Sequence, residues 1–269
     1  MQIAYHTLNF GLWKNPDDEK VLAAIRRAGY DAVEGLLYED PSKIRSLLEK
    51  SGLTLTAVYM SGHLMGMDDA QIREEAKRLV ALGKAVGVSI AGGFVSRSDG
   101  KAHHSYGTCD EHYVEVARRL ESLGRILADG GMTLTVHNHI DNMTETEEEL
   151  DILLDGTDSR YVGLLFDTAH AVCGGSDPVR LCKKYASRIK HLHIKDTENL
   201  LHGRPYFFKN RFTPLGEGVI DFPSIFEILK RSGYAGAYCV ELDASVSSNP
   251  DPEASAKISR EYLRKHLQV

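Results

Sequence analysis

The sequence predicts an α/β protein with one (β/α)8 (TIM) barrel, and three observations support this fold. The chain has 269 residues, a usual length for a single barrel of this kind. An amphipathic helix, a glycine and a short apolar strand follow one another repeatedly, as in "AAIRRAGYDAVEG" and "ILADGGMTLTVH". Eight strands are expected, a helical pattern follows each, and no linker divides residues 1–269, so we expect one domain.

The strands are expected near residues 2–5, 31–35, 53–58, 88–92, 132–137, 161–167, 189–194 and 236–241. Helices are expected to end at Gly29, Gly52, Gly87, Gly130 and Gly233. Asp177 before Pro178 and Asp221 before Pro223 mark helix starts. A doubly wound sheet is the alternative, but it would more often carry a glycine-rich phosphate loop after the first strand, where this chain has "YHTLNFGLW".

A long loop is expected at 197–215, after the seventh strand. Among its residues are Arg204, Tyr206, Phe207 and Phe208. This composition indicates a lid or a subunit contact, and a plain surface excursion is the alternative.

The bulk composition excludes several classes of protein. With 42% hydrophobic and 26% charged residues the chain is typical of a globular protein, and its net charge of -6 disfavours nucleic-acid binding. No apolar stretch is long enough to span a bilayer, and no signal-peptide pattern is present. Four scattered cysteines without CxxC spacing indicate reduced thiols and no thiolate zinc site. We therefore expect a cytoplasmic protein with no nucleic acid or membrane partner, and homo-oligomerisation is left open.

Polar residues end four successive strands, and the alternation of strand side chains directs them inward. Chemistry in such barrels lies at the carboxyl ends of the strands. In 132–137 the apolar side chains suit the helix layer, so His137 and His139 face the barrel mouth. The same alternation directs Asp167, His193 and Glu241 inward on the next three strands.

Two imidazoles and two carboxylates at one rim suit a divalent metal ion. The oxygen ligands favour Mn2+ or Mg2+ and the nitrogens favour transition metals, so Mn2+ fits best, with Co2+, Mg2+, Fe2+ and Zn2+ as alternatives. Any one of these residues alone would more often be a hydrogen-bonded rim residue. Four matching strand ends favour a shared site at His137, Asp167, His193 and Glu241. By contrast, His191 is expected to be a packed or a functional histidine, Cys239 to be core, and His103 and His104 to be solvated.

Five motifs resemble the xylose-isomerase-like superfamily of metal-dependent sugar isomerases, epimerases and dehydratases: "GYDAVEG", "LLFDTAH", "HLHIKD", "GEGVIDF" and "VEL". The resemblance covers nearly the whole chain. It implies that Asp167, His193 and Glu241 bind the metal. The fourth ligand is usually a glutamate in a phrase like LENH, and here "VHNH" puts His137 at that position. Within the superfamily the chain is most similar to the inosose dehydratase group, through "TETEEELDILLDGTD" and "FTPLGEGVIDFPSIFEILKRSGY".

The resemblance implies a small sugar or cyclitol as substrate, and the expected reaction is dehydration of a keto-polyol such as an inosose, by β-elimination through an enediolate. A two-base epimerase uses paired carboxylates, and His137 removes one of them. A metal, one base and one acid are sufficient for elimination of water. His139 is the candidate general base or acid.

Other residues expected at the same rim are candidates for proton transfer or for contact with substrate. Glu34 and Glu241 are candidate proton carriers, and Glu34 is expected at the rim. The resemblance implies that His170 and Lys195 contact substrate oxygens, and Asn138 is placed with them.

Four alternatives remain open. The first is an isomerase or epimerase of a sugar or sugar phosphate, and the second is elimination from a 3-keto-glycoside or dehydroshikimate. The third, an endonuclease IV-like DNA repair enzyme, needs three zinc ions and basic residues for phosphate, and the acidic charge disfavours it. The fourth is a sugar-binding barrel without catalysis.

Overall fold

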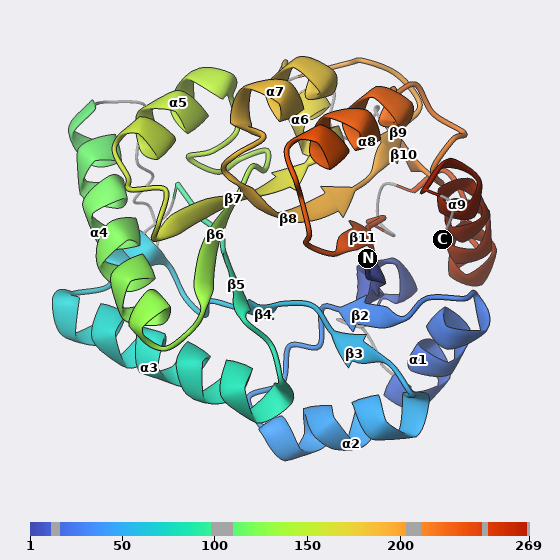
Figure 1. Cartoon of the computed structure of the whole chain (residues 1–269), viewed down its shortest axis with the longest axis horizontal. Coiled ribbons are helices and arrows are strands. Elements are labelled where there is room, and N and C mark those ends of the chain that lie inside the picture. The colour runs from blue at the N-terminus through green and yellow to red at the C-terminus, as the bar shows by residue number, and fades with distance from the viewer. Residues whose placement is uncertain (12–16, 98–109, 203–210, 244–246, 268–269) are drawn as a thin grey trace.

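The computed structural model describes residues 1–11, 17–97, 110–202, 211–243 and 247–267, and it confirms the predicted barrel. A central parallel sheet has the strand order β3-β2-β1-β11-β8-β7-β6-β5-β4, and helices surround it (Figure 1). Its strands are β1 (Ile3–His6), β2 (Ala32–Glu34), β3 (Thr54–Leu55), β4 (Val58–Tyr59), β5 (Ile90–Gly93), β6 (Thr133–His137), β7 (Val162–Asp167), β8 (Ile189–Ile194) and β11 (Tyr238–Val240).

The predicted third strand is divided into two short ones, and this division closes the barrel. β3 pairs with β2, whereas β4 pairs with β5 on the other side. The ladder continues through Thr56 N–H to Val33 O at 3.2 Å and through Met60 N–H to Gly92 O at 2.9 Å. Tilted barrel strands are staggered relative to their neighbours, so one extended segment bonds first to one side and then to the other.

The main helices are α1 (Asp18–Arg27), α2 (Pro41–Ser51), α3 (Asp69–Val86), α4 (Asp110–Asp129), α5 (Glu147–Asp155), α6 (Thr168–Cys173), α7 (Pro178–Tyr185), α8 (Phe222–Arg231) and α9 (Pro252–Leu267). Asp177 and Asp221 cap α7 and α8 as predicted. The predicted left-handed end at Gly130 is wrong. Gly131 takes that conformation instead, with φ 81°, because Gly130 N–H still continues the helix to Ile126 O at 3.1 Å.

The segment after β8 is anchored at both ends. β9 (Asp196–Thr197) and β10 (Phe212–Thr213) pair antiparallel, so the expected loop at 197–215 begins and ends in a small sheet. The Asp196 carboxylate accepts backbone N–H groups of Gly216 at 3.0 Å, Gly218 at 3.1 Å and Ile220 at 3.2 Å. This fixes the "GEGVI" turn against the end of β8. The residues singled out in this loop, Arg204 and Tyr206 to Phe208, lie outside the described residues, as do His103, His104 and Cys109.

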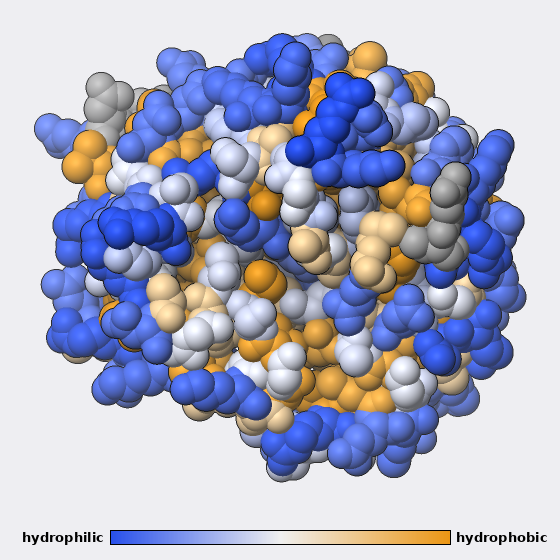
Figure 2. All heavy atoms as spheres, in the orientation of Figure 1, coloured by the Kyte–Doolittle hydropathy of each residue, from blue (hydrophilic) through white to orange (hydrophobic). Residues whose placement is uncertain are grey.

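The apolar core lies between the strands and the helices. Outward side chains such as Leu134, Val136 and Phe166 are fully buried there, while the barrel interior holds the small residues Ala4, Ala32 and Cys239. In Figure 2 hydrophilic residues border the visible face, and apolar residues show mainly between them. Within the described ranges, no helix combines the length and the apolar character needed to cross a bilayer.

Candidate metal and substrate site

The structure brings the four predicted metal ligands together. His137 ends β6, Asp167 ends β7, His193 lies on β8 and Glu241 follows β11, and these four strands are neighbours in the sheet. Donor atoms of His137, Asp167 and His193 lie within 4.8 Å of one another. His137 Nε2 is 3.6 Å from Asp167 Oδ2, and His193 Nδ1 is 2.6 Å from Glu241 Oε2. All four side chains are buried.

Each of these side chains has a buried atom that could bind a metal ion and that makes no hydrogen bond within the described structure. These atoms are Nε2 of His137, Oδ2 of Asp167, Nδ1 of His193 and Oε2 of Glu241. Two of them, Nδ1 of His193 and Oε2 of Glu241, face each other as an ion pair at 2.6 Å, and Oδ2 of Asp167 lies 3.3 Å from Lys195 Nζ. Four potential ligand atoms that make no hydrogen bond at adjacent strand ends fit a bound cation.

A second trio, Glu34, His193 and Cys239, also brings its donor atoms within 4.8 Å. Both oxygens of Glu34 are already bonded, to His191 Nε2 at 2.7 Å and to His193 Nε2 at 2.6 Å. Burial also raises the pKa of the Cys239 thiol well above its usual value, which disfavours the thiolate. The first trio is therefore the better cation site.

Lys195 is the fixed positive charge of the site. Its Nζ donates to Glu241 Oε1 at 2.9 Å and lies 3.3 Å from Asp167 Oδ2 and from His170 Nε2. Burial acts to lower the pKa of Lys195, but the carboxylates of Asp167 and Glu241 outweigh it and raise the pKa above its usual value. The ammonium group therefore stays charged and holds Glu241 in place.

The histidines of the site divide into neutral and charged rings. Burial lowers the pKa of His137 to about 3 and holds the pKa of His139 and of His170 below the usual value. Burial acts in the same direction on His193, but the carboxylates of Glu241 and Glu34 outweigh it and raise its pKa to about 10. Without a metal ion, His193 is thus an imidazolium between two carboxylates.

His139 and His170 lie side by side beside the predicted ligands. Their ring centroids are 3.7 Å apart, and His139 is 5.4 Å from His137. His139 Nδ1 lies 2.6 Å from Ile140 O. A carbonyl only accepts hydrogen bonds, so Nδ1 carries the proton and the lone pair of the neutral ring is on Nε2.

Asn138 and Glu34 are both held by hydrogen bonds to other residues of the site. The Asn138 amide accepts from Asp167 N–H at 2.7 Å and donates to Asp167 O at 2.9 Å, so it ties the end of β6 to the end of β7. Glu34 ends β2 beside the other candidate site residues and is fully buried against His191 and His193 rather than solvated. The side chains that meet its carboxylate reach it across the interior of the barrel.

Sequence reasoning missed His6 and Tyr59. The His6 ring lies 5.7 Å from the His193 ring, and Tyr59 OH is 3.2 Å from His193 Nε2. The signal for His6 was present, because it follows Ala4 on the inward face of the first strand. Tyr59 lies just beyond the expected third strand, and a Cβ on Gly92 would meet its ring at 2.4 Å, so glycine is needed there.

Two phenylalanines border the same site and were also missed. Phe94 is 37% exposed, stacks on Tyr59 at 5.8 Å and meets the His137 ring edge-on at 5.0 Å. Phe212 is fully buried, and its ring centroid is 4.8 Å from Lys195 Nζ. Phe94 thus offers an apolar surface next to the candidate ligands. The C–H groups on one face of a substrate could contact this surface.

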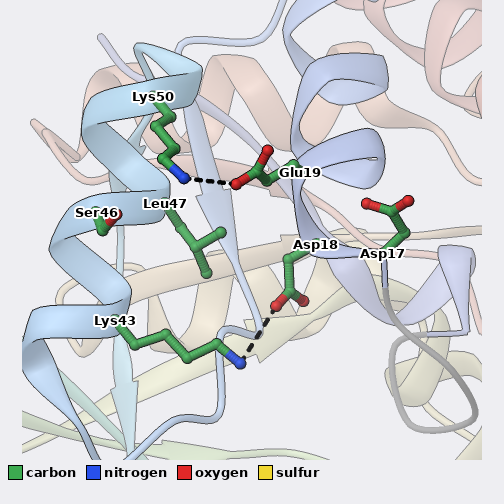
Figure 3. Close-up of a pocket in the computed structure, with 7 residues that line it drawn as sticks. All are labelled: Asp17, Asp18, Glu19, Lys43, Ser46, Leu47 and Lys50. Atoms are coloured by element: carbon green, nitrogen blue, oxygen red, sulfur yellow. Dashed lines mark hydrogen bonds and ion pairs between the residues drawn. The ribbon is translucent and has the colours of Figure 1, made fainter.

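A surface groove between α1 and α2 is the clearest alternative to this site (Figure 3). Its charges are paired internally, Lys50 Nζ with Glu19 Oε1 at 2.6 Å and Lys43 Nζ with Asp18 Oδ2 at 3.5 Å. None of the predicted site residues lines it. Exposed, mutually paired charges are ordinary surface features, so the strand ends remain the candidate site.

Comparison with known proteins agrees with the geometry. An inosose dehydratase of Clostridium botulinum is 32% identical over 280 residues, which cover 96% of this chain and 92% of that protein. A sugar phosphate isomerase/epimerase structure from Parabacteroides distasonis has a TM-score of 0.75 at 22% identity, covering 97% of this chain and 93% of that one. The structure of the probable 3-DHS dehydratase AsbF from Bacillus anthracis has a TM-score of 0.73 at 18% identity, covering 98% of both chains.

The two structural matches show the fold alone, whereas the sequence matches show the family. A family model described as a xylose isomerase-like TIM barrel matches residues 22–266. Together with the inosose dehydratase match, it confirms the resemblance inferred from the motifs. The chain belongs to the xylose isomerase-like TIM barrel family.

Proposed function

We propose that this protein is a metal-dependent hydro-lyase that removes water from a keto-polyol, an inosose above all. The observation that carries the proposal is the set of buried donor atoms without hydrogen bonds on His137, Asp167, His193 and Glu241. The similarity to an inosose dehydratase over 96% of the chain supports the reaction and the substrate class. Two nitrogen and two oxygen ligands fit a divalent ion, and Mn2+ suits this mixture best.

A bound divalent ion would supply Lewis acidity, which polarises a substrate carbonyl and makes the neighbouring C–H group more acidic. The protein holds such an ion through the four ligands. Lys195 orients Glu241 through the 2.9 Å contact, and the Asn138 amide orients the backbone of Asp167. We therefore assign Asn138 to positioning a ligand rather than to contacting substrate.

His139 is the residue we assign to removal of the proton beside the ketone. A base must be neutral and must present a lone pair. Burial keeps the pKa of His139 below its usual value, and the bond from Nδ1 to Ile140 O leaves the lone pair on Nε2. The half-buried position of His139, beside ligand His137, suits contact with a substrate held at the ion.

His170 and Lys195 are assigned to substrate oxygens. The ammonium group of Lys195 can only donate, so His170 Nε2 accepts from it at 3.3 Å and the neutral His170 ring carries its proton on Nδ1. His170 therefore presents an N–H donor, the form that can hydrogen-bond the hydroxyl that leaves. Elimination needs one proton taken at carbon and one supplied to the leaving hydroxyl. The proton that His139 takes makes it an imidazolium, which can pass that proton to the hydroxyl while the neutral His170 orients this group by a hydrogen bond; the two tilted rings have centroids 3.7 Å apart.

The test is turnover of keto-inositols, ketoses, sugar phosphates and 3-keto-glycosides, followed by mass spectrometry of the products. The Mn2+-loaded protein should convert a keto-inositol into a product lighter by one water, and EDTA-treated protein should not. A product of unchanged mass would replace dehydration by isomerisation or epimerisation. Equal turnover with and without EDTA, on protein shown to be metal-free, would overturn the metal-dependent mechanism.

A further inference from the structure

We propose that the buried carboxylate of Glu34 fixes the tautomer and the orientation of His193, and so sets how tightly the site holds its ion. Glu34 acts here as a positioning residue rather than as a proton carrier. The inference rests on the proposed function, because it takes His193 as a metal ligand. It adds a residue from the opposite side of the barrel to the site.

Glu34 reaches His193 across the barrel interior. It ends β2, and β1 and β11 lie between β2 and β8 in the sheet. Its Oε1 lies 2.6 Å from His193 Nε2, and its Oε2 lies 2.7 Å from His191 Nε2. The side chain has no solvent-exposed surface.

Four hydrogen-bond donors surround this carboxylate. The hydroxyl of Thr56 donates to Oε2 and the hydroxyl of Tyr59 donates to Oε1, in addition to the two imidazoles. Both oxygens of Glu34 are thereby occupied, and neither faces open space in which a substrate could lie. A carboxylate held in this way keeps its charge and its place, which are the properties that a supporting residue needs.

The consequence for His193 follows from hydrogen-bond chemistry. Without an ion, both ring nitrogens of His193 face a carboxylate, Nε2 that of Glu34 at 2.6 Å and Nδ1 that of Glu241 at 2.6 Å. Nδ1 is on the side of the predicted ligands, so an ion would replace the proton there. Glu34 only accepts, so it keeps the remaining proton on Nε2 and leaves Nδ1 to the ion. A carboxylate behind a histidine ligand also raises the basicity of that ligand, and removing such a partner typically weakens metal binding by about 10–100-fold.

The other histidine ligand provides a contrast within the same site. Neither ring nitrogen of His137 makes a hydrogen bond to a residue that the structure describes. His137 therefore has no carboxylate behind it, and the support from Glu34 acts on His193 alone. Loss of Glu34 should accordingly change one ligand and leave the environment of His137 as it is.

The direct test is the dissociation constant of Zn2+ for Glu34→Gln, measured by competition with a chromophoric chelator on protein with a native circular dichroism spectrum. Gln keeps the shape of the side chain and removes its charge. We expect Zn2+ affinity to fall by about 10–100-fold. The matched control is Glu149→Gln, which removes a buried carboxylate bonded to Tyr113 OH at 2.6 Å, away from the site, and should leave the affinity unchanged. A Glu34→Gln affinity within twofold of the wild-type value would overturn the inference.

A second measurement on the wild-type chain does not depend on the folding of a variant. Long-range 1H–15N spectra of the Zn2+-loaded protein should show His193 protonated at Nε2 and bound to zinc through Nδ1. Coordination through Nε2 would overturn the inference while leaving the metal site itself in place. Failure of the wild-type chain to bind Zn2+, Mn2+ or Co2+ would instead overturn the proposed function, so the two failures are distinguishable.

Discussion

Replacing Lys195 by methionine should expose how strongly the site depends on positive charge. Methionine keeps most of the aliphatic length of the side chain and removes the ammonium group. Lys195 is 1% exposed, and its Nζ lies 2.9 Å from Glu241 Oε1 and 3.3 Å from Asp167 Oδ2. The substitution therefore leaves two buried carboxylates without their shared cation.

The expected loss of stability is large in the metal-free protein. Removing one partner of a buried ion pair destabilises a protein by about 3–5 kcal/mol, because the other charge stays buried. The total free energy of unfolding of a domain is only about 5–15 kcal/mol. A bound divalent ion supplies the missing positive charge, so it should stabilise Lys195→Met more than it stabilises the wild-type protein. Binding at 100 times the dissociation constant alone contributes about 2.7 kcal/mol.

The assay is urea unfolding followed by circular dichroism, in EDTA and in excess Mn2+. Lys190→Met is the matched control, since Lys190 lies on the same strand with an exposed side chain, and its Nζ donates to the backbone oxygen of Ser187 at 3.1 Å. We expect the control to unfold like the wild type. A loss below about 1 kcal/mol for Lys195→Met in EDTA, or equal stabilisation of both proteins by Mn2+, would refute this reasoning.

Four other outcomes are expected. Asp167→Ala should lose the metal while it keeps the fold by circular dichroism, and full occupancy by elemental analysis would remove Asp167 from the ligand set. His137→Glu should keep the metal and depress dehydration, and an unchanged rate would show that this position does not decide the reaction. His139→Ala should keep the metal and lose turnover by about 10²–10⁴-fold, whereas near-normal turnover would transfer the base role to another group. At pH 8 the ion should displace about one proton from His193, whose pKa is about 10, so affinity should fall as pH falls; calorimetry in two buffers of different ionisation enthalpy measures the released proton.

The clustering of the four candidate ligands could be predicted because it depends on local rules. Strand side chains alternate, and the apolar residues of each strand end showed which face the helices cover. That reasoning brought His137, Asp167, His193 and Glu241 to one place before any contact was known, and the structure collects them there. The same rule would have found His6, which follows Ala4 by two residues.

The contacts that support these ligands could not be predicted in the same way. Glu34 meets His193 across the barrel, 159 positions along the chain and on a strand that is not a neighbour, so strand periodicity carries no information about the contact. Tyr59 enters the site because the third strand changes its partner, and this depends on the stagger of the whole barrel. Asn138 bonds to a neighbouring backbone just past the strand end, where alternation no longer fixes side-chain direction.

The charges at the site give a reason for a divalent ion that does not depend on ligand preferences. Neighbouring cationic groups hold the pKa of Glu34, Asp167 and Glu241 low despite burial, so all three are ionised. Against them stand Lys195 and, without metal, the imidazolium of His193. An ion that binds at His193 must displace the proton of that ring, so it replaces a positive charge among these buried carboxylates. A divalent ion brings more positive charge than the proton that it displaces, and this favours it over a monovalent ion beside three buried carboxylates.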